Sequence, residues 1–160
     1  MASLVTVGIN SYVTTEEVDA YAALSVNGSD WVNATQSEKD AAIVSAARAI
    51  DRQPLKGRKY DYWTPQTMAF PRYIEDYNSY ATMISDTTIP QQVKDAQCEE
   101  ALALFAHAND TRLELARLGM SSATIDGVSE AYRDSMGKGL ISQVAKELLR
   151  PWLADVVDII

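Results

Sequence analysis

Residues 90–109, PQQVKDAQCEEALALFAHAN, decide the fold of this 160-residue chain. Pro90 suits the first turn of a helix, because the N–H group that proline lacks has no intrahelical acceptor there. The apolar residues that follow recur at helical spacing: Val93, Ala96, Ala101, Leu102, Leu104, Phe105 and Ala108. A helix with so wide an apolar surface is typical of the centre of a bundle, and we expect the other elements to pack around it.

A second helix is predicted over residues 36–52. Thr35 and Glu38 have the spacing of a capping box, in which each residue bonds the backbone of the other at the start of a helix. The apolar residues then share one face: Ile43, Ala46, Ala47 and Ile50. Another capping box at residues 14–17 predicts a shorter helix from residue 15, and the pattern of residues 140–149 predicts a last helix.

Two further patterns indicate extended structure. Asp126-Gly127 stands between two β-compatible runs, which predicts a hairpin over residues 120–133. Alternating Val5, Val7 and Ile9 predict a short strand or an extended arm within residues 1–12. The sequence therefore predicts a mainly α fold, a small bundle of four to five helices with a long ordered loop, a minor β-hairpin and extended terminal arms.

The carboxyl end departs from this pattern. We expect one helical domain over residues 1–150 and a carboxyl-terminal arm over residues 151–160. The arm ends in four large apolar residues: Val156, Val157, Ile159 and Ile160. Such a segment is too apolar to leave in water and too short to fold alone, so we expect it to dock onto a partner. A truncation after Pro151 is then expected to leave folding intact.

The long loop spans residues 54–89, which sustain neither the helical nor the strand period. Seven of the thirteen aromatic residues of the chain fall within it: Tyr60, Tyr62, Trp63, Phe70, Tyr73, Tyr77 and Tyr80. Because disordered linkers are poor in aromatic residues, the composition predicts an ordered loop. Loops of this length are usually functional.

A basic segment precedes the aromatic residues. Residues 48–59 contain five basic residues and one acid, Asp51, in a chain that has 22 acidic residues, 14 basic ones and a net charge of -8. Basic residues beside aromatic ones suit single-stranded nucleic acid, whose phosphates meet cations and whose bases stack on rings. An equally open alternative is that these cations pair with acidic neighbours in the same or an adjacent subunit.

Composition argues against several classes of function. One cysteine and one histidine cannot make an internal disulfide or a metal site with several histidines, and no glycine-rich phosphate loop is present. We therefore expect no enzyme, no cofactor and no metal. The first twelve residues carry no Lys or Arg, and no apolar run approaches eighteen residues, so we expect a cytoplasmic protein with no membrane partner.

Short motifs follow one another in order along most of the chain. They are Ser11-Tyr12-Val13-Thr14, Glu17-Val18-Asp19-Ala20-Tyr21, Trp31, Ala46 through Ile50-Asp51, Gly57-Arg58, Phe70-Pro71-Arg72, Ile89-Pro90 with Val93, Lys94, Ala96 and Glu99, and Leu148-Leu149-Arg150-Pro151-Trp152-Leu153. Together they resemble a family of tailed-phage proteins labelled DnaT-like single-stranded-DNA-binding proteins, which are similar to the head–tail connector, or adaptor, proteins of bacteriophage particles. Residues 73–89 depart from the family pattern, being longer and richer in tyrosine, and no role is carried over to them.

The resemblance implies a structural virion protein, a head–tail adaptor assembled in the host cytoplasm. It would form a dodecameric ring in the virion neck, bind the portal protein and a tail-terminator or stopper protein, and let double-stranded DNA pass through its channel. The portal-binding residues would be Pro151, Trp152, Leu153, Val156, Val157, Ile159 and Ile160. The residues at subunit interfaces or facing DNA would be Arg52, Lys56, Arg58, Lys59, Trp63, Phe70 and Arg72.

The family resemblance suggests two functions, a head–tail adaptor and a single-stranded-DNA-binding protein, and the net charge favours the adaptor. A conduit has to let DNA slide, and an acidic wall repels phosphate. The alternative function is a single-stranded-DNA-binding replication accessory protein, which needs net attraction to phosphate. That alternative relies on Arg58 and Lys59 for binding.

Overall fold

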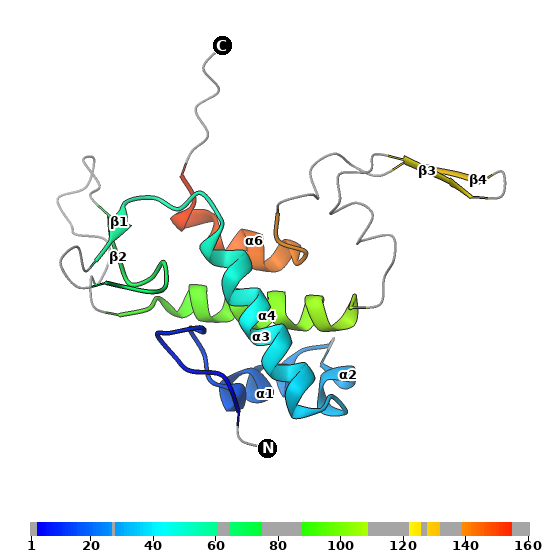
Figure 1. Cartoon of the computed structure of the whole chain (residues 1–160), viewed down its shortest axis with the longest axis horizontal. Helices are drawn as coiled ribbons and strands as arrows, with labels where there is room; N and C mark the ends of the chain where they lie inside the picture. The colour runs from blue at the N-terminus through cyan, green and yellow to red at the C-terminus, as the bar shows by residue number, and fades with distance from the viewer. Residues whose placement is uncertain are drawn as a thin grey trace, which may run out of the picture.

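Two sixteen-residue helices, α3 (Gln36–Asp51) and α4 (Gln91–Ala106), cross and pack against each other (Figure 1). The structure is a computed structural model that describes residues 3–26, 28–60, 65–74, 88–108, 122–125, 128–131 and 139–154. For 122–125 and 128–131 it describes the backbone alone. The helix predicted from Pro90 is confirmed as the centre of the bundle, since α1, α2, α3 and α6 all contact it.

Shorter helices cover the central pair from two sides (Figure 1). They are α1 (Thr15–Leu24), α2 (Ser29–Val32) and α6 (Gln143–Leu149), and α6 continues into a 3-10 turn, η2 (Arg150–Trp152). Both predicted capping boxes are present, at the first residues of α1 and of α3. Helix α2 was not predicted, and its buried Trp31 packs edge-on against Phe105.

The apolar core consists of two clusters of buried side chains. One, the Phe70 cluster, comprises Tyr12, Ala47, Ile50, Met68, Ala69, Phe70, Val93, Ala96, Ala145, Leu149 and Trp152. The other comprises Val13, Val18, Ala22, Trp31, Ala42, Ile43, Ala46, Cys98, Ala101 and Leu102. Because α3 and α4 supply residues to both clusters, the two helices join them into one core.

Two buried polar side chains of α4 tie other segments to this core. Gln97 accepts a hydrogen bond from the Tyr12 backbone N–H at 2.8 Å and donates one to the Ile43 carbonyl at 3.0 Å. Glu100 accepts bonds from the two backbone N–H groups that precede α6, at 3.0 and 2.9 Å. A buried polar group costs little when it is hydrogen-bonded, and these bonds also fix where the neighbouring segments lie.

The predicted fold class is confirmed: the structure is mainly α with a small antiparallel hairpin. The hairpin strands are β3 (Ser122–Ile125) and β4 (Val128–Ala131), and Ile125 pairs with Val128. The predicted Asp-Gly turn at 126–127 lies outside the described residues. Within the described parts of the chain, no helix is both long and apolar enough to span a membrane.

The amino-terminal segment differs from the predicted strand. Val7 makes a single bridge to Ser11, and the intervening residues form a turn in which Gly8 has a φ of 82°. The Asn10 side chain closes this turn by accepting from Thr6 N at 2.7 Å and donating to the Leu4 carbonyl at 3.0 Å. The alternating apolar residues therefore do not form a strand. The local turn already provides hydrogen bonds for backbone groups that, in a strand, would need a partner strand.

The first residues of the expected carboxyl-terminal arm pack against the protein's own core and do not project toward a partner. Trp152 is buried in the Phe70 cluster, and Leu153 is half-buried and bridged to Leu55. Backbone bonds join the same segments, from Lys56 N to the Trp152 carbonyl at 2.8 Å and from Ala154 N to the Pro54 carbonyl at 2.7 Å. Residues 152–154 thus pack with the folded core, which argues against the expectation that truncation after Pro151 spares folding. Residues 155–160 lie outside the described residues.

Candidate functional site

The predicted loop contains a short antiparallel ribbon that the sequence analysis missed. Strands β1 (Arg58–Lys59) and β2 (Arg72–Tyr73) pair with Arg58 opposite Tyr73 and Lys59 opposite Arg72. Strands of two residues are too short to show alternation, so only their pairing identifies them. The ribbon brings two distant parts of the loop side by side (Figure 1), and its pairing sets basic Arg58 opposite aromatic Tyr73.

The buried side chain of Arg72 forms hydrogen bonds to the backbone of the ribbon and of the residues next to it. Its guanidinium group donates to the carbonyls of Lys56 and Gly57, both at 2.8 Å, and to those of Leu55 and Ala69, both at 3.3 Å. The side chain is buried, and burial lowers its pKa. Arg72 was predicted to face DNA or a subunit neighbour, but all these donors point into the chain, so its role is to fix the shape of residues 55–57.

Phe70 was also predicted to face outward and is instead 2% exposed. Its ring meets Tyr12 and Trp152 edge to face, with centroid distances of 5.8 and 6.1 Å. Its large apolar ring makes burial favourable, and the chain provides two aromatic partners for it. Trp63, another predicted contact residue, lies outside the described residues, as do Val156, Val157, Ile159 and Ile160.

The other predicted basic residues lie at or near the surface. Arg58 and Lys59 are exposed on β1, Arg52 is exposed just after α3, and Lys56 is half-buried. Lys59 Nζ donates to the carbonyls of Gln66 and Thr67 at 2.8 and 3.2 Å, which ties that turn to the ribbon. Pro151, predicted to bind a portal, is exposed beside the buried Trp152.

Arg58 stacks on an aromatic ring. Its guanidinium carbon lies 5.0 Å from the centroid of the Tyr73 ring, within the range of a cation–π contact. Tyr73 is half-buried, and exposed Tyr60 follows β1. A cation and an aromatic face therefore lie together at the surface of the ribbon.

The single acid of the basic segment turns inward. The Asp51 carboxylate accepts a short hydrogen bond from the Tyr12 hydroxyl and a second from the Ala69 N–H at 3.3 Å. Burial raises the pKa of Asp51, and the bond from Tyr12 opposes that shift. Burial, with the bond to Asp51, raises the pKa of Tyr12. The Asp51 carboxylate is directed at Tyr12 and Ala69, and its charge also interacts with those of Lys59 and Arg72 on the ribbon.

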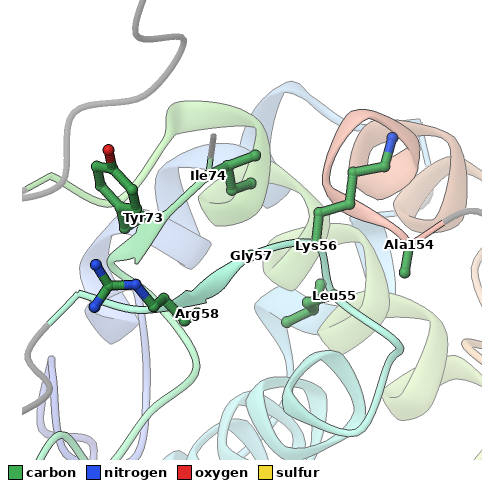
Figure 2. Close-up of a pocket in the computed structure, with 7 residues that line it drawn as sticks. All are labelled: Leu55, Lys56, Gly57, Arg58, Tyr73, Ile74 and Ala154. Carbon is green, nitrogen blue, oxygen red and sulfur yellow. The ribbon is translucent and has the colours of Figure 1, made fainter. Parts of the chain in front are cut away.

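A groove of about 570 Å³ opens between the ribbon and the carboxyl-terminal segment (Figure 2). Its lining residues are Leu55, Lys56, Gly57, Arg58, Tyr73, Ile74 and Ala154. Sequence reasoning assigned Lys56 and Arg58 to a site but did not bring Leu55, Ile74 and Ala154 to it. No local signal could have done so, because Ala154 reaches the groove through its pairing with residue 54.

The ribbon offers cationic and aromatic side chains, among them Arg58, Lys59 and Tyr73. Across the described residues, no three His, Cys, Asp or Glu side chains are grouped so that they could hold a metal ion. The fold and the ribbon together define a small helical protein that displays a basic and aromatic surface.

The comparisons with known proteins identify the family. Residues 3–158 match the family described as "Putative DnaT-like ssDNA binding protein", and the chain belongs to that family. No curated protein and no solved structure matches the chain.

This family corrects the function expected from the sequence. The family description names single-stranded DNA, and nothing in the comparisons supports a virion adaptor, so the head–tail interpretation is wrong. The partners expected with it are corrected too: the dodecameric ring, the portal protein, the stopper and the passage of double-stranded DNA. The expected place in the virion neck followed from the adaptor function and is not tested by these comparisons.

Proposed function

We propose that this protein binds single-stranded DNA through the surface of the β1–β2 ribbon, as a binding protein with no catalytic step. The family description names single-stranded DNA as the ligand. The ribbon supplies the two kinds of group that such a ligand uses, cations for phosphates and aromatic faces for bases.

The observation that carries the proposal is the contact between Arg58 and Tyr73. Two residues that are fifteen positions apart are brought into register by the ribbon, with the guanidinium 5.0 Å from the ring centroid. Exposed Lys59 and Tyr60 continue the same strand and its end. A strand of DNA lying along the ribbon can place a phosphate at Arg58 while a neighbouring base meets an aromatic face.

The net charge of -8 weakens such binding but does not prevent it. Exposed charges separated by more than a Debye length, about 10 Å at 0.1 M salt, are largely screened from each other. The ribbon lies within residues 48–76, which carry six basic and four acidic residues, a local net charge of +2. Local attraction therefore favours DNA at this face, and the overall acidity keeps affinity moderate and sensitive to salt.

Fluorescence anisotropy with a labelled oligo(dT) at several salt concentrations tests the proposal. Arg58→Gln should weaken binding and reduce the slope of log affinity against log salt by about 0.7 if one phosphate contact is lost. Lys39→Gln is the matched control, because it also removes one positive charge. Lys39 pairs with Asp19 at 2.9 Å and lies about 20 Å along α3 from the end nearest the ribbon.

Loss of affinity in Arg58→Gln with no change in Lys39→Gln supports the ribbon as the binding surface. Equal losses in the two variants would indicate charge attraction without a site. No binding by the wild type at low salt would refute the function itself.

A further inference from the structure

The groove beside Arg58 has the size and chemistry of a small-ligand site. Its volume of about 570 Å³ lies within the range of about 300–1,000 Å³ that is common for such sites. Tyr73 and Arg58 lie at one end and Ala154 at the other, with Leu55, Ile74 and Lys56 between them (Figure 2). An apolar stretch thus runs beside a cation and an aromatic ring.

We propose that this groove accepts one unstacked nucleobase of the bound single strand while Arg58 holds an adjacent phosphate. This inference rests on the proposed function and adds to it that the bases, and not only the phosphates, are recognised. A base is flat, aromatic and apolar on its faces, which suits the surface between Tyr73 and Ala154. The phosphate that follows it is an anion, which suits the guanidinium at the rim.

The groove is held in shape by the backbone around it. Arg72 fixes the carbonyls of residues 55–57, and the bonds between residues 54–56 and 152–154 fix the opposite wall. Gly57 has a φ of 71°, and a Cβ atom there would lie 2.2 Å from the Tyr73 carbonyl oxygen. The close approach of Gly57 to β2 therefore requires glycine, and a base would enter a site that is already formed.

Two oligonucleotides of equal length separate base recognition from attraction to phosphate. One is oligo(dT) and the other carries abasic sites, so that the phosphates are the same and the bases are absent. The wild type should bind oligo(dT) at least about five-fold more tightly, because each base–aromatic stack contributes to affinity. Ala154→Leu fills the groove without changing charge or the backbone bond to Pro54, and it should lower that ratio to below about two-fold.

The control variant is Ala41→Leu, which makes the same change at an exposed position on α3 and should keep the wild-type ratio. In the wild-type protein, a 2-aminopurine base in the oligonucleotide should change its fluorescence on binding as it leaves the stack. This measurement needs no variant, so an unchanged fluorescence overturns the base-binding groove even if Ala154→Leu fails to fold.

The outcomes distinguish the two proposals. If neither oligonucleotide binds the wild type at low salt, the proposed function fails. If both bind equally and 2-aminopurine fluorescence does not change, DNA binding stands and the base-binding groove is overturned. If Ala154→Leu keeps the wild-type ratio of affinities for oligo(dT) and the abasic oligonucleotide, the base-binding groove is also overturned, because the bases then bind at another surface.

Discussion

Replacing Arg72 by methionine tests whether one buried guanidinium holds the binding surface together. Methionine keeps an unbranched stem that reaches as far as the position of the arginine Nε, but it has no hydrogen-bond donor. The carbonyls of Lys56 and Gly57 would lose bonds of 2.8 Å, and those of Leu55 and Ala69 would lose weaker bonds of 3.3 Å. The side chain is only 9% exposed, so water has little room to replace the lost donors.

The expected loss of stability follows from these bonds. Each hydrogen bond from a charged donor contributes about 1.5–3 kcal/mol, and the two short bonds dominate. Burial of the guanidinium has a cost of its own, visible in its lowered pKa, and methionine removes that cost. We expect a net loss of about 2–4 kcal/mol. With a urea m-value of about 2 kcal/mol/M, the unfolding midpoint should fall by about 1–2 M.

Urea denaturation followed by tryptophan fluorescence measures this midpoint, and Arg58→Met is the control. Arg58 lies on the same ribbon but is exposed, so its loss should cost less than about 1 kcal/mol. If Arg72→Met unfolds at the same urea concentration as the wild type, the guanidinium does not hold residues 55–57. The reasoning about the shape of the groove would then be refuted.

Three other predictions test the core and its titrating groups. Trp152→Ala should lower stability by about 3–5 kcal/mol in urea denaturation, and Trp152→Phe by less, because the indole Nε1 has no hydrogen-bond partner in the described structure. Near-wild-type stability of Trp152→Ala would place residue 152 outside the core. Burial opposes ionisation of Asp40, but bonds from Leu4 N, Gln36, Ser3 and Thr15 outweigh it and lower its pKa. The stability advantage of the wild type over Asp40→Asn should therefore be complete above about pH 5 and shrink below about pH 4 in urea titrations; a difference independent of pH would contradict this. Burial raises the pKa of Cys98 to about 12, so a thiol reagent at pH 8 should label it only as the chain unfolds, and rapid labelling without urea would contradict its burial.

Local signals predicted most of the helices. The capping boxes at Thr14 and Thr35 act within four residues of chain, and the apolar face of residues 93–108 needs only the helical period. Burial of Phe70 and Arg72 was not predictable in this way, because an aromatic and a basic residue in a loop are equally compatible with a surface. Only the positions of Tyr12, Trp152 and the carbonyls of residues 55–57 decide it.

The candidate site also combines residues that could be predicted from the sequence with residues that could not. Composition alone singled out the basic segment and therefore Arg58 and Lys59, which are exposed on β1. Tyr73, Ile74 and Ala154 complete the groove through pairings between segments up to about a hundred residues apart. Net charge led to the wrong function because it averages over the chain, whereas binding depends on the charge within about one Debye length of the site.

Competition between single-stranded and double-stranded DNA tests the central claim most directly. A labelled oligo(dT) bound to the wild-type protein is challenged with unlabelled single strand or duplex at equal phosphate concentration and low salt. Attraction to charge alone favours the duplex, whose charge density is higher, whereas stacking on Tyr73 and its neighbours requires unpaired bases. The account predicts that the single strand competes several-fold better, and equal or better competition by the duplex would contradict it.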